Sequence, residues 1–136
     1  MVKIEQFDHL VLVTNSLTDC LRFYGDVLGM TIECKNNRYA LRFGQQKINI
    51  HTRKAEFLPA AQYPTPGSLD LCLVVSGPMA EVKRELMEKG LSLETDIVAR
   101  NGAQGNMQSI YLRDPDGNLV ELCSYEDSEV RSWNRK

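Results

Sequence analysis

The sequence contains the stretch Asp114-Pro115-Asp116-Gly117-Asn118-Leu119-Val120-Glu121-Leu122, which predicts a tight turn leading into a strand. Asp-Pro favours an extended residue before a fixed φ, and Asp-Gly supplies a corner that tolerates positive φ. Apolar runs lie on both sides of the corner, at 109–112 and 119–123. The stretch therefore predicts a β-hairpin.

Glu121 is the unusual residue of this hairpin. Side chains alternate along a strand, so Glu121 points away from the face that Val120 and Leu122 share. If that other face is open to solvent, the carboxylate is an ordinary surface group. If the sheet curves around a cavity, Glu121 is a candidate metal ligand or general base, and the strand alone favours neither.

Composition and charge limit the class of protein. The chain has 136 residues, a net charge of −2 and 43% hydrophobic residues, which predicts one soluble globular domain. No basic stripe indicates nucleic acid, and no apolar run is long enough for a membrane span or a signal peptide, so we expect a cytoplasmic protein. Four cysteines without CxxC spacing favour reduced thiols over disulfides or a thiolate zinc site.

Hydrophobic periodicity predicts the order β-α-β-β-β twice. The first set of expected elements comprises strand 7–14, helix 17–28 and strands 30–34, 39–43 and 47–51. The second set comprises strand 69–75, a helix from Gly77-Pro78 to Gly90, and strands 91–98, 107–112 and 118–124, with a loop over 100–106. That loop is either a lid or, more simply, a surface connection.

A constant offset relates the two sets. Asp70 follows His9 by 61 residues (70 − 9), and Gly90 follows Gly29 by the same number (90 − 29). The matching element order and this offset indicate an internal duplication. We therefore predict an α+β fold in which two βαβββ modules form a curved mixed β-sheet with the helices outside and a shared concavity. The expected modules span about 6–55 and 67–125, joined by a Pro-rich linker 56–66 and followed by a tail 126–136, all within a single domain 1–136.

Three separated segments resemble the vicinal oxygen chelate superfamily, which contains glyoxalase I, bleomycin resistance proteins and extradiol dioxygenases. These segments are Phe7 to Val13, Leu21 to Met30 and Asp114 to Leu122, and the resemblance covers nearly the whole chain. The resemblance is specific for the fold and much less so for the reaction. It implies a metal site built from the first and last strands of each module.

Carried over to this chain, the resemblance gives His9, Asp70 and Glu121 as metal ligands. The last-strand position of the first module stays open between Asn49 and His51, which have the same strand parity, and we include His51 in the candidate set. Asp70 stands where the family more often has His. One imidazole and two carboxylates suit Mn²⁺, Fe²⁺, Ni²⁺ or Zn²⁺.

The resemblance implies a glyoxalase-like lyase or isomerase acting on a small substrate with adjacent oxygens, such as the hemithioacetal of methylglyoxal and glutathione. In that reading Glu121 is both ligand and catalytic base, glutathione is a co-substrate, and the protein is a homodimer. The alternatives are a sequestering protein of the bleomycin-resistance type, or a ring-cleaving dioxygenase. The dioxygenase is disfavoured because its ligand set is His, His and Glu.

Overall fold

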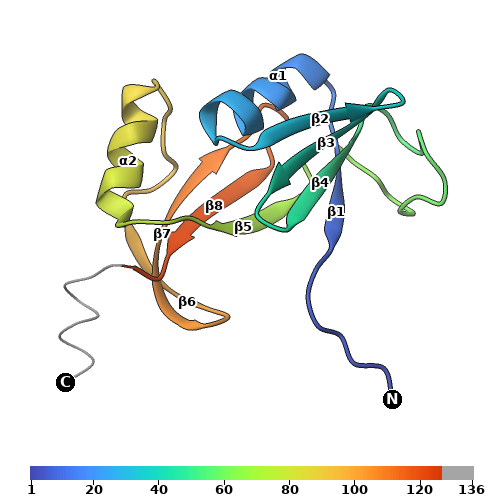
Figure 1. The fold of residues 1–136 in the computed structure, drawn as a ribbon. Coiled ribbons are helices and arrows are strands. Elements are labelled where there is room, and N and C mark those ends of the chain that lie inside the picture. The colour runs from blue at the N-terminus through green and yellow to red at the C-terminus, as the bar shows by residue number, and fades with distance from the viewer. Residues whose placement is uncertain (127–136) are drawn as a thin grey trace. The chain divides into compact units, whose positions relative to one another are not determined.

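The computed structural model describes residues 1–126, so most of the predicted tail lies outside the described residues. The chain forms two compact units, each containing one four-stranded mixed sheet. The first unit comprises Met1–Leu69 and Pro115–Gly117, and the second comprises Asp70–Asp114 and the described residues from Asn118 onward. The predicted βαβββ order occurs in both, which confirms the fold class (Figure 1).

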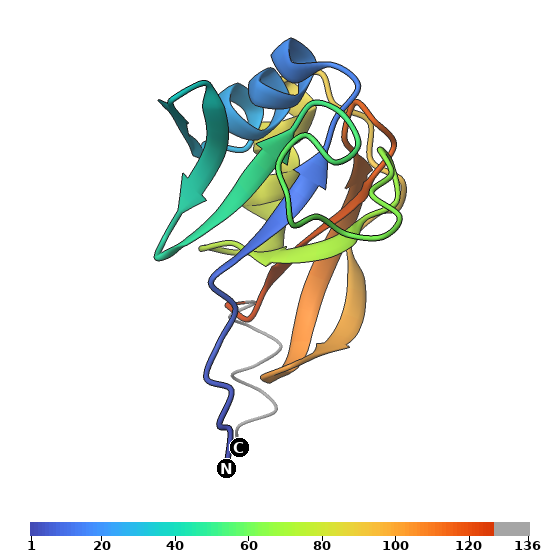
Figure 2. The same cartoon turned by 90° about the vertical axis from the view of Figure 1, so that its right-hand side faces the viewer.

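The first unit has the sheet order β1-β4-β3-β2. Its elements are β1 (His9–Val13), α1 (Leu17–Leu21), the π-helical turn η1 (Arg22–Val27), β2 (Thr31–Lys35), β3 (Arg38–Phe43) and β4 (Gln46–His51). Ser16 caps α1, because its hydroxyl accepts a hydrogen bond from the Asp19 N–H. β1 and β4 pair in parallel, with His9 opposite Lys47 and Val13 opposite His51, and they lie side by side in Figure 2.

One face of this sheet forms the core of the first unit. Leu12, Leu41, Ile48 and Ile50 are almost completely buried. Gly25 of η1 lies so close to Ile32 on the same face that a Cβ would collide with the isoleucine side chain. The helical segment therefore covers the apolar face, and the opposite face carries most of the ionisable side chains together with Val11, Val13 and Ala40.

The second unit has the order β5-β8-β7-β6. Its elements are β5 (Asp70–Val74), α2 (Met79–Glu88), β6 (Val98–Gly102), β7 (Gly105–Arg113) and β8 (Leu119–Ser124). β5 pairs in parallel with β8, as β1 does with β4. α2 packs beside β7 (Figure 1), and its Met79 and Leu86 are buried with Ile110 and Leu112.

The structure corrects one predicted strand. Residues 91–97 are not a strand, and β6 begins at Val98, within what we predicted as the end of a strand and the loop 100–106. Gly102 and Gly105 face each other in the register, so Ala103 and Gln104 form a tight hairpin turn rather than a lid. Within the predicted loop, Asn101-Gly102 ends β6, Gln104 lies in the turn and Gly105 begins β7.

The Asp114–Asn118 corner forms the predicted hairpin between β7 and β8. The Asn118 N–H donates to Asp114 Oδ1 at 2.9 Å, and its Nδ2 donates to Oδ2 at 2.7 Å, both in buried positions. The tip of the corner belongs to the first unit: Thr14 Oγ1 donates to Asp116 Oδ2 at 2.5 Å, and the Asn15 N–H donates to Oδ1 at 2.8 Å.

We predict that Asp116→Ala lowers the free energy of unfolding by about 1–3 kcal/mol, because both hydrogen bonds go to one carboxylate and Thr14 is buried. Urea denaturation followed by circular dichroism measures the change. Asp26→Ala, an exposed aspartate in η1, is the control and should change stability by less than about 0.5 kcal/mol. Equal stability of the two variants would contradict this anchoring role.

Candidate functional site

The polar face of the first sheet carries most of the ionisable groups of its strands. Register places the following residues on this face: His9, Val11 and Val13 of β1, Lys47, Asn49 and His51 of β4, Arg38, Ala40 and Arg42 of β3, and Glu33 and Lys35 of β2. This face contains both histidines of the chain. It is the candidate binding face of the first unit.

His9 begins β1 with a side chain that is 43% exposed. Its Nδ1 lies 2.7 Å from Asp8 Oδ1, and this hydrogen bond is the main reason that the pKa of the Asp8 carboxyl is lowered. A carboxylate on one ring nitrogen fixes the orientation of the imidazole and leaves Nε2 for a ligand, as is common for metal-binding histidines.

The register distinguishes Asn49 from His51. His51 is opposite Val13, four positions along the paired strands from His9, which is roughly 13 Å at a strand rise of 3.3 Å per residue. Asn49 is opposite Val11, which lies two positions along β1 from His9, so Asn49 is half that distance from His9 along the strands. The His51 ring instead packs edge-on against Phe57, with ring centroids 5.2 Å apart.

The second unit places Asp70 and Glu121 on one face of adjacent strands. Cys72 is opposite Glu121 and Asp70 is opposite Leu119, so the two carboxylates are two register positions apart. Asp70 is exposed, whereas Oε2 of Glu121 is buried and has no hydrogen-bond partner of normal geometry; the Glu121 carboxyl also interacts with the thiol of its register partner Cys72. An ionised oxygen in such a place requires a cation or a donor, and this is the one observation that fits Glu121 to a metal ion.

The duplication gives an independent assignment of the open position. With the offset of 61 that relates His9 to Asp70, Val11 corresponds to Cys72. Because Val11 is opposite Asn49 and Cys72 is opposite Glu121, the counterpart of Glu121 in the first unit is Asn49. The counterpart of His51 is Cys123. The register thus favours Asn49 over His51 as the first-unit counterpart of Glu121.

The predicted ligands are divided evenly between the units: His9 and His51 lie in the first, Asp70 and Glu121 in the second. Within residues 1–126, no group of three or more His, Cys, Asp or Glu side chains is gathered closely enough to hold a metal ion. The four-residue ligand set therefore stays a prediction.

Two cavities open on the first unit, and both include His51 in their linings. The larger, about 530 Å³, is lined by polar and cationic side chains of β2, β3 and β4 together with Phe57. The smaller, about 360 Å³, lies under the loop that follows β4 and is lined by Val11, Val13 and the segment from Pro59 to Leu69. Both have the size of small-molecule sites.

Sequence reasoning missed part of this lining. The sequence did not single out Arg38, Lys47 or Phe57, which all line the larger cavity. Lys47 could have been found from its spacing, because Lys47, Asn49 and His51 alternate along one strand and must share a face. Phe57 gives no such signal, since its position depends on the path of the loop after β4.

Comparison with known proteins identifies the class. Residues 6–122 match the model of the Glyoxalase/Bleomycin resistance protein/Dioxygenase superfamily, and the chain belongs to this superfamily. Its members commonly bind small-molecule ligands, often use divalent metals, and commonly form dimers. Over residues 1–126, none of the helices is both long and apolar enough to cross a membrane.

Particular relatives are similar over most of their length. The virulence protein STM3117 of Salmonella typhimurium is 48% identical over 123 residues, which is 90% of this chain and 85% of that protein. Its crystal structure superposes with a TM-score of 0.88, covering 91% of this chain and 99% of the other. The glyoxalase domain-containing protein RDO1 of Mycosarcoma maydis is 40% identical over 94% of this chain and 73% of its own. Lactoylglutathione lyase from Agrobacterium tumefaciens shares the fold, with a TM-score of 0.70 at 20% identity, covering 93% of this chain and 98% of the other.

The thiols around Glu121 give a reactivity prediction. Burial, followed by the hydrogen bond to Cys123 and the nearby Glu121 charge, raises the pKa of the Cys72 thiol. Cys34 and Cys72 are both exposed, but the thiolate is the reactive form and the pKa of Cys72 is raised, so at neutral pH we expect iodoacetamide to alkylate Cys34 well before Cys72. Cys20 and Cys123 are buried and should react only in denaturant. Peptide mass spectrometry measures the order, and rapid alkylation of Cys72 would contradict it.

Proposed function

We propose that this protein is a metal-dependent lyase or isomerase of the glyoxalase type, with His9, Asp70 and Glu121 as metal ligands and Glu121 also as the base. The buried Oε2 of Glu121, which has no hydrogen-bond partner of normal geometry, carries the proposal. The Asp8–His9 hydrogen bond supports it, because it leaves Nε2 free to coordinate. Membership of the superfamily also supports a metal site built from such donors.

The donor chemistry defines what would bind. An imidazole with two carboxylates, supplemented by the Asn49 amide oxygen, is a hard to borderline set that suits Ni²⁺, Zn²⁺, Mn²⁺ or Fe²⁺. A bound divalent ion supplies Lewis acidity toward a substrate that carries adjacent oxygens. The two carboxylates would balance its charge.

The chain's own groups then move the proton. Glu121 would remove the proton from the substrate carbon next to the carbonyl and return it to the carbonyl carbon, while the hydroxyl proton passes to the former carbonyl oxygen, so the reaction is an isomerisation with no net redox change. His9, held by Asp8, positions the chelated oxygens. The proposed substrate is a hemithioacetal formed from a 2-oxoaldehyde and a thiol such as glutathione, and we propose a homodimer as the assembly.

A second candidate is a sequestering protein that binds a small molecule without turnover. The two cavities favour it, because their linings lie in the first unit and include neither Asp70 nor Glu121. This function predicts ligand binding that is insensitive to Glu121→Gln. The experiments below separate the two candidates.

Metal content is the first test. Protein purified without a histidine tag should contain about one divalent ion per proposed site, measured by inductively coupled plasma mass spectrometry. The metal content should fall at least tenfold in His9→Gln and Glu121→Gln. His51→Gln is the matched control and should keep its metal, whereas Asn49→Ala should weaken retention. Loss of metal in His51→Gln but not in Asn49→Ala would contradict the register argument. Metal-free wild type that does not take up any of the four ions would refute the proposal.

Turnover is the second test. We expect wild type loaded with one of the four ions to isomerise the hemithioacetal of methylglyoxal and glutathione, followed by the ultraviolet absorbance of the thioester product. Glu121→Asp, which keeps a carboxylate ligand but displaces the base, should lower kcat by about 10²–10⁴-fold while retaining metal. Glu88→Asp on the exposed face of α2 is the control and should match wild type. An unchanged kcat in Glu121→Asp would exclude Glu121 as the base.

A further inference from the structure

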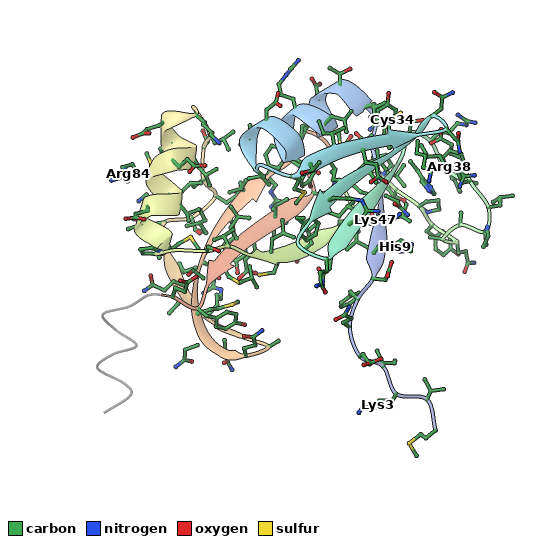
Figure 3. The ribbon with its side chains drawn as sticks, in the orientation of Figure 1. Lys3, His9, Cys34, Arg38, Lys47 and Arg84 are labelled. Carbon is green, nitrogen blue, oxygen red and sulfur yellow. The ribbon has the colours of Figure 1, made fainter. Side chains whose placement is uncertain are left out.

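The larger cavity of the first unit is rich in cationic groups. Lys35 of β2, Arg38 of β3 and Lys47 of β4 line it, with Glu33 as its one lining carboxylate. The protein as a whole has a net charge of −2, so this concentration of positive charge is a local feature. Figure 3 shows Lys47 next to His9, and the two residues are register partners on β4 and β1.

Carboxylates of the described residues act on these cations only from beyond ion-pair distance. The pKa of Asp8 is lowered mainly by its hydrogen bond to His9 and further by the Lys47 charge. Glu33 is engaged by Arg42, whose Nε donates to its carboxylate at 2.5 Å and lowers the pKa of Glu33. The charges of Lys47 and Lys35 lower that pKa further. Within residues 1–126, Lys35, Arg38 and Lys47 form no ion pair. Three like charges that share a cavity repel one another, and a bound anion would remove that repulsion.

Arg38 is held in place by an aromatic contact. Its guanidinium carbon lies 4.1 Å from the centroid of the Phe57 ring, and the edge-on packing of His51 supports the same ring. Stacking leaves the N–H groups at the edge of the guanidinium available to donate hydrogen bonds. It also reduces the side-chain entropy that Arg38 loses when a ligand binds. A fork of this kind is suited to a carboxylate or a phosphate.

An alternative explanation covers only part of this arrangement. Lysine and arginine on a sheet edge discourage pairing with other chains, which accounts for Lys35 on the edge strand β2 and for Arg38 at the start of β3. Lys47 does not fit that explanation, because β4 is an interior strand and the side chain is half-buried. A half-buried, unpaired ammonium in a cavity indicates a ligand site.

We propose that this cavity binds the oxyanion group of a small ligand, a carboxylate or a phosphate, through Lys47 and Arg38 with Lys35 at the rim. Binding of the anion uses first-unit residues alone and needs no metal. The further step, that the bound oxyanion is part of the substrate, rests on the proposed function. The substrate would then carry an acidic group within reach of the strands that hold His9 and Asn49.

The test uses three probes of similar shape: benzoate, phenyl phosphate and the uncharged benzamide. Isothermal titration of the full chain at fixed ionic strength, with a chelator present, should show binding of benzoate or phenyl phosphate and at least tenfold weaker binding of benzamide. The tighter of the two anions identifies the source of the oxyanion. Lys47→Met and Arg38→Gln should each weaken the anion about tenfold and leave benzamide unchanged.

Matched controls are available on the same chain. Lys3→Met removes a lysine from the exposed N-terminal segment, and Arg84→Gln removes an exposed arginine from α2 (Figure 3). Both should bind the anion as wild type does, and so should Glu121→Gln. Equal affinity for benzamide and benzoate, or equal weakening by Lys3→Met and Lys47→Met, would overturn the inference. Anion binding by a protein that takes up no metal would refute the proposed function while leaving this inference intact.

Discussion

Parallel pairing of the first and last strands of each unit is the constraint on which the candidate site depends. β1 lies beside β4 and β5 beside β8, so residues from the two ends of one module share a face and a register. In both sheets the apolar face is covered by the unit's own helical segment. The opposite face is then free to collect polar groups without cost to the core.

Much of the fold could be predicted because its signals are local. The Asp-Gly corner and the alternation around Glu121 follow from neighbouring residues, and the 61-residue offset follows from comparing the two halves of the chain; the element order that they predict is confirmed. β6 was misplaced because its strand, Val98–Gly102, has no hydrophobic alternation and ends in Asn-Gly. Its pairing with β7 overrides the weak local preference of these residues.

The candidate site could be predicted only where strand parity decided it. Parity indicated that Glu121 leaves the core face, and the structure adds that Oε2 is buried without a hydrogen-bond partner of normal geometry. The choice between Asn49 and His51 required the actual register, which parity alone does not give. The Phe57 contact depends on how the loop after β4 folds back, and no periodic pattern encodes that path.

The charge of the proposed metal ligands bears on how the basic cavity would act. If Asp70 and Glu121 neutralise a divalent ion, an anionic substrate gains little attraction from the ion itself. Its binding would then need positive charge supplied by the protein, and Lys47, in register with His9, is placed on the strand where that charge would act. The Arg42–Glu33 ion pair keeps the carboxylate that lines the cavity engaged. Under the proposed function, an acidic ligand set and a basic cavity would therefore have complementary roles: the metal ion would activate the substrate oxygens and Lys47 would select an acidic substrate.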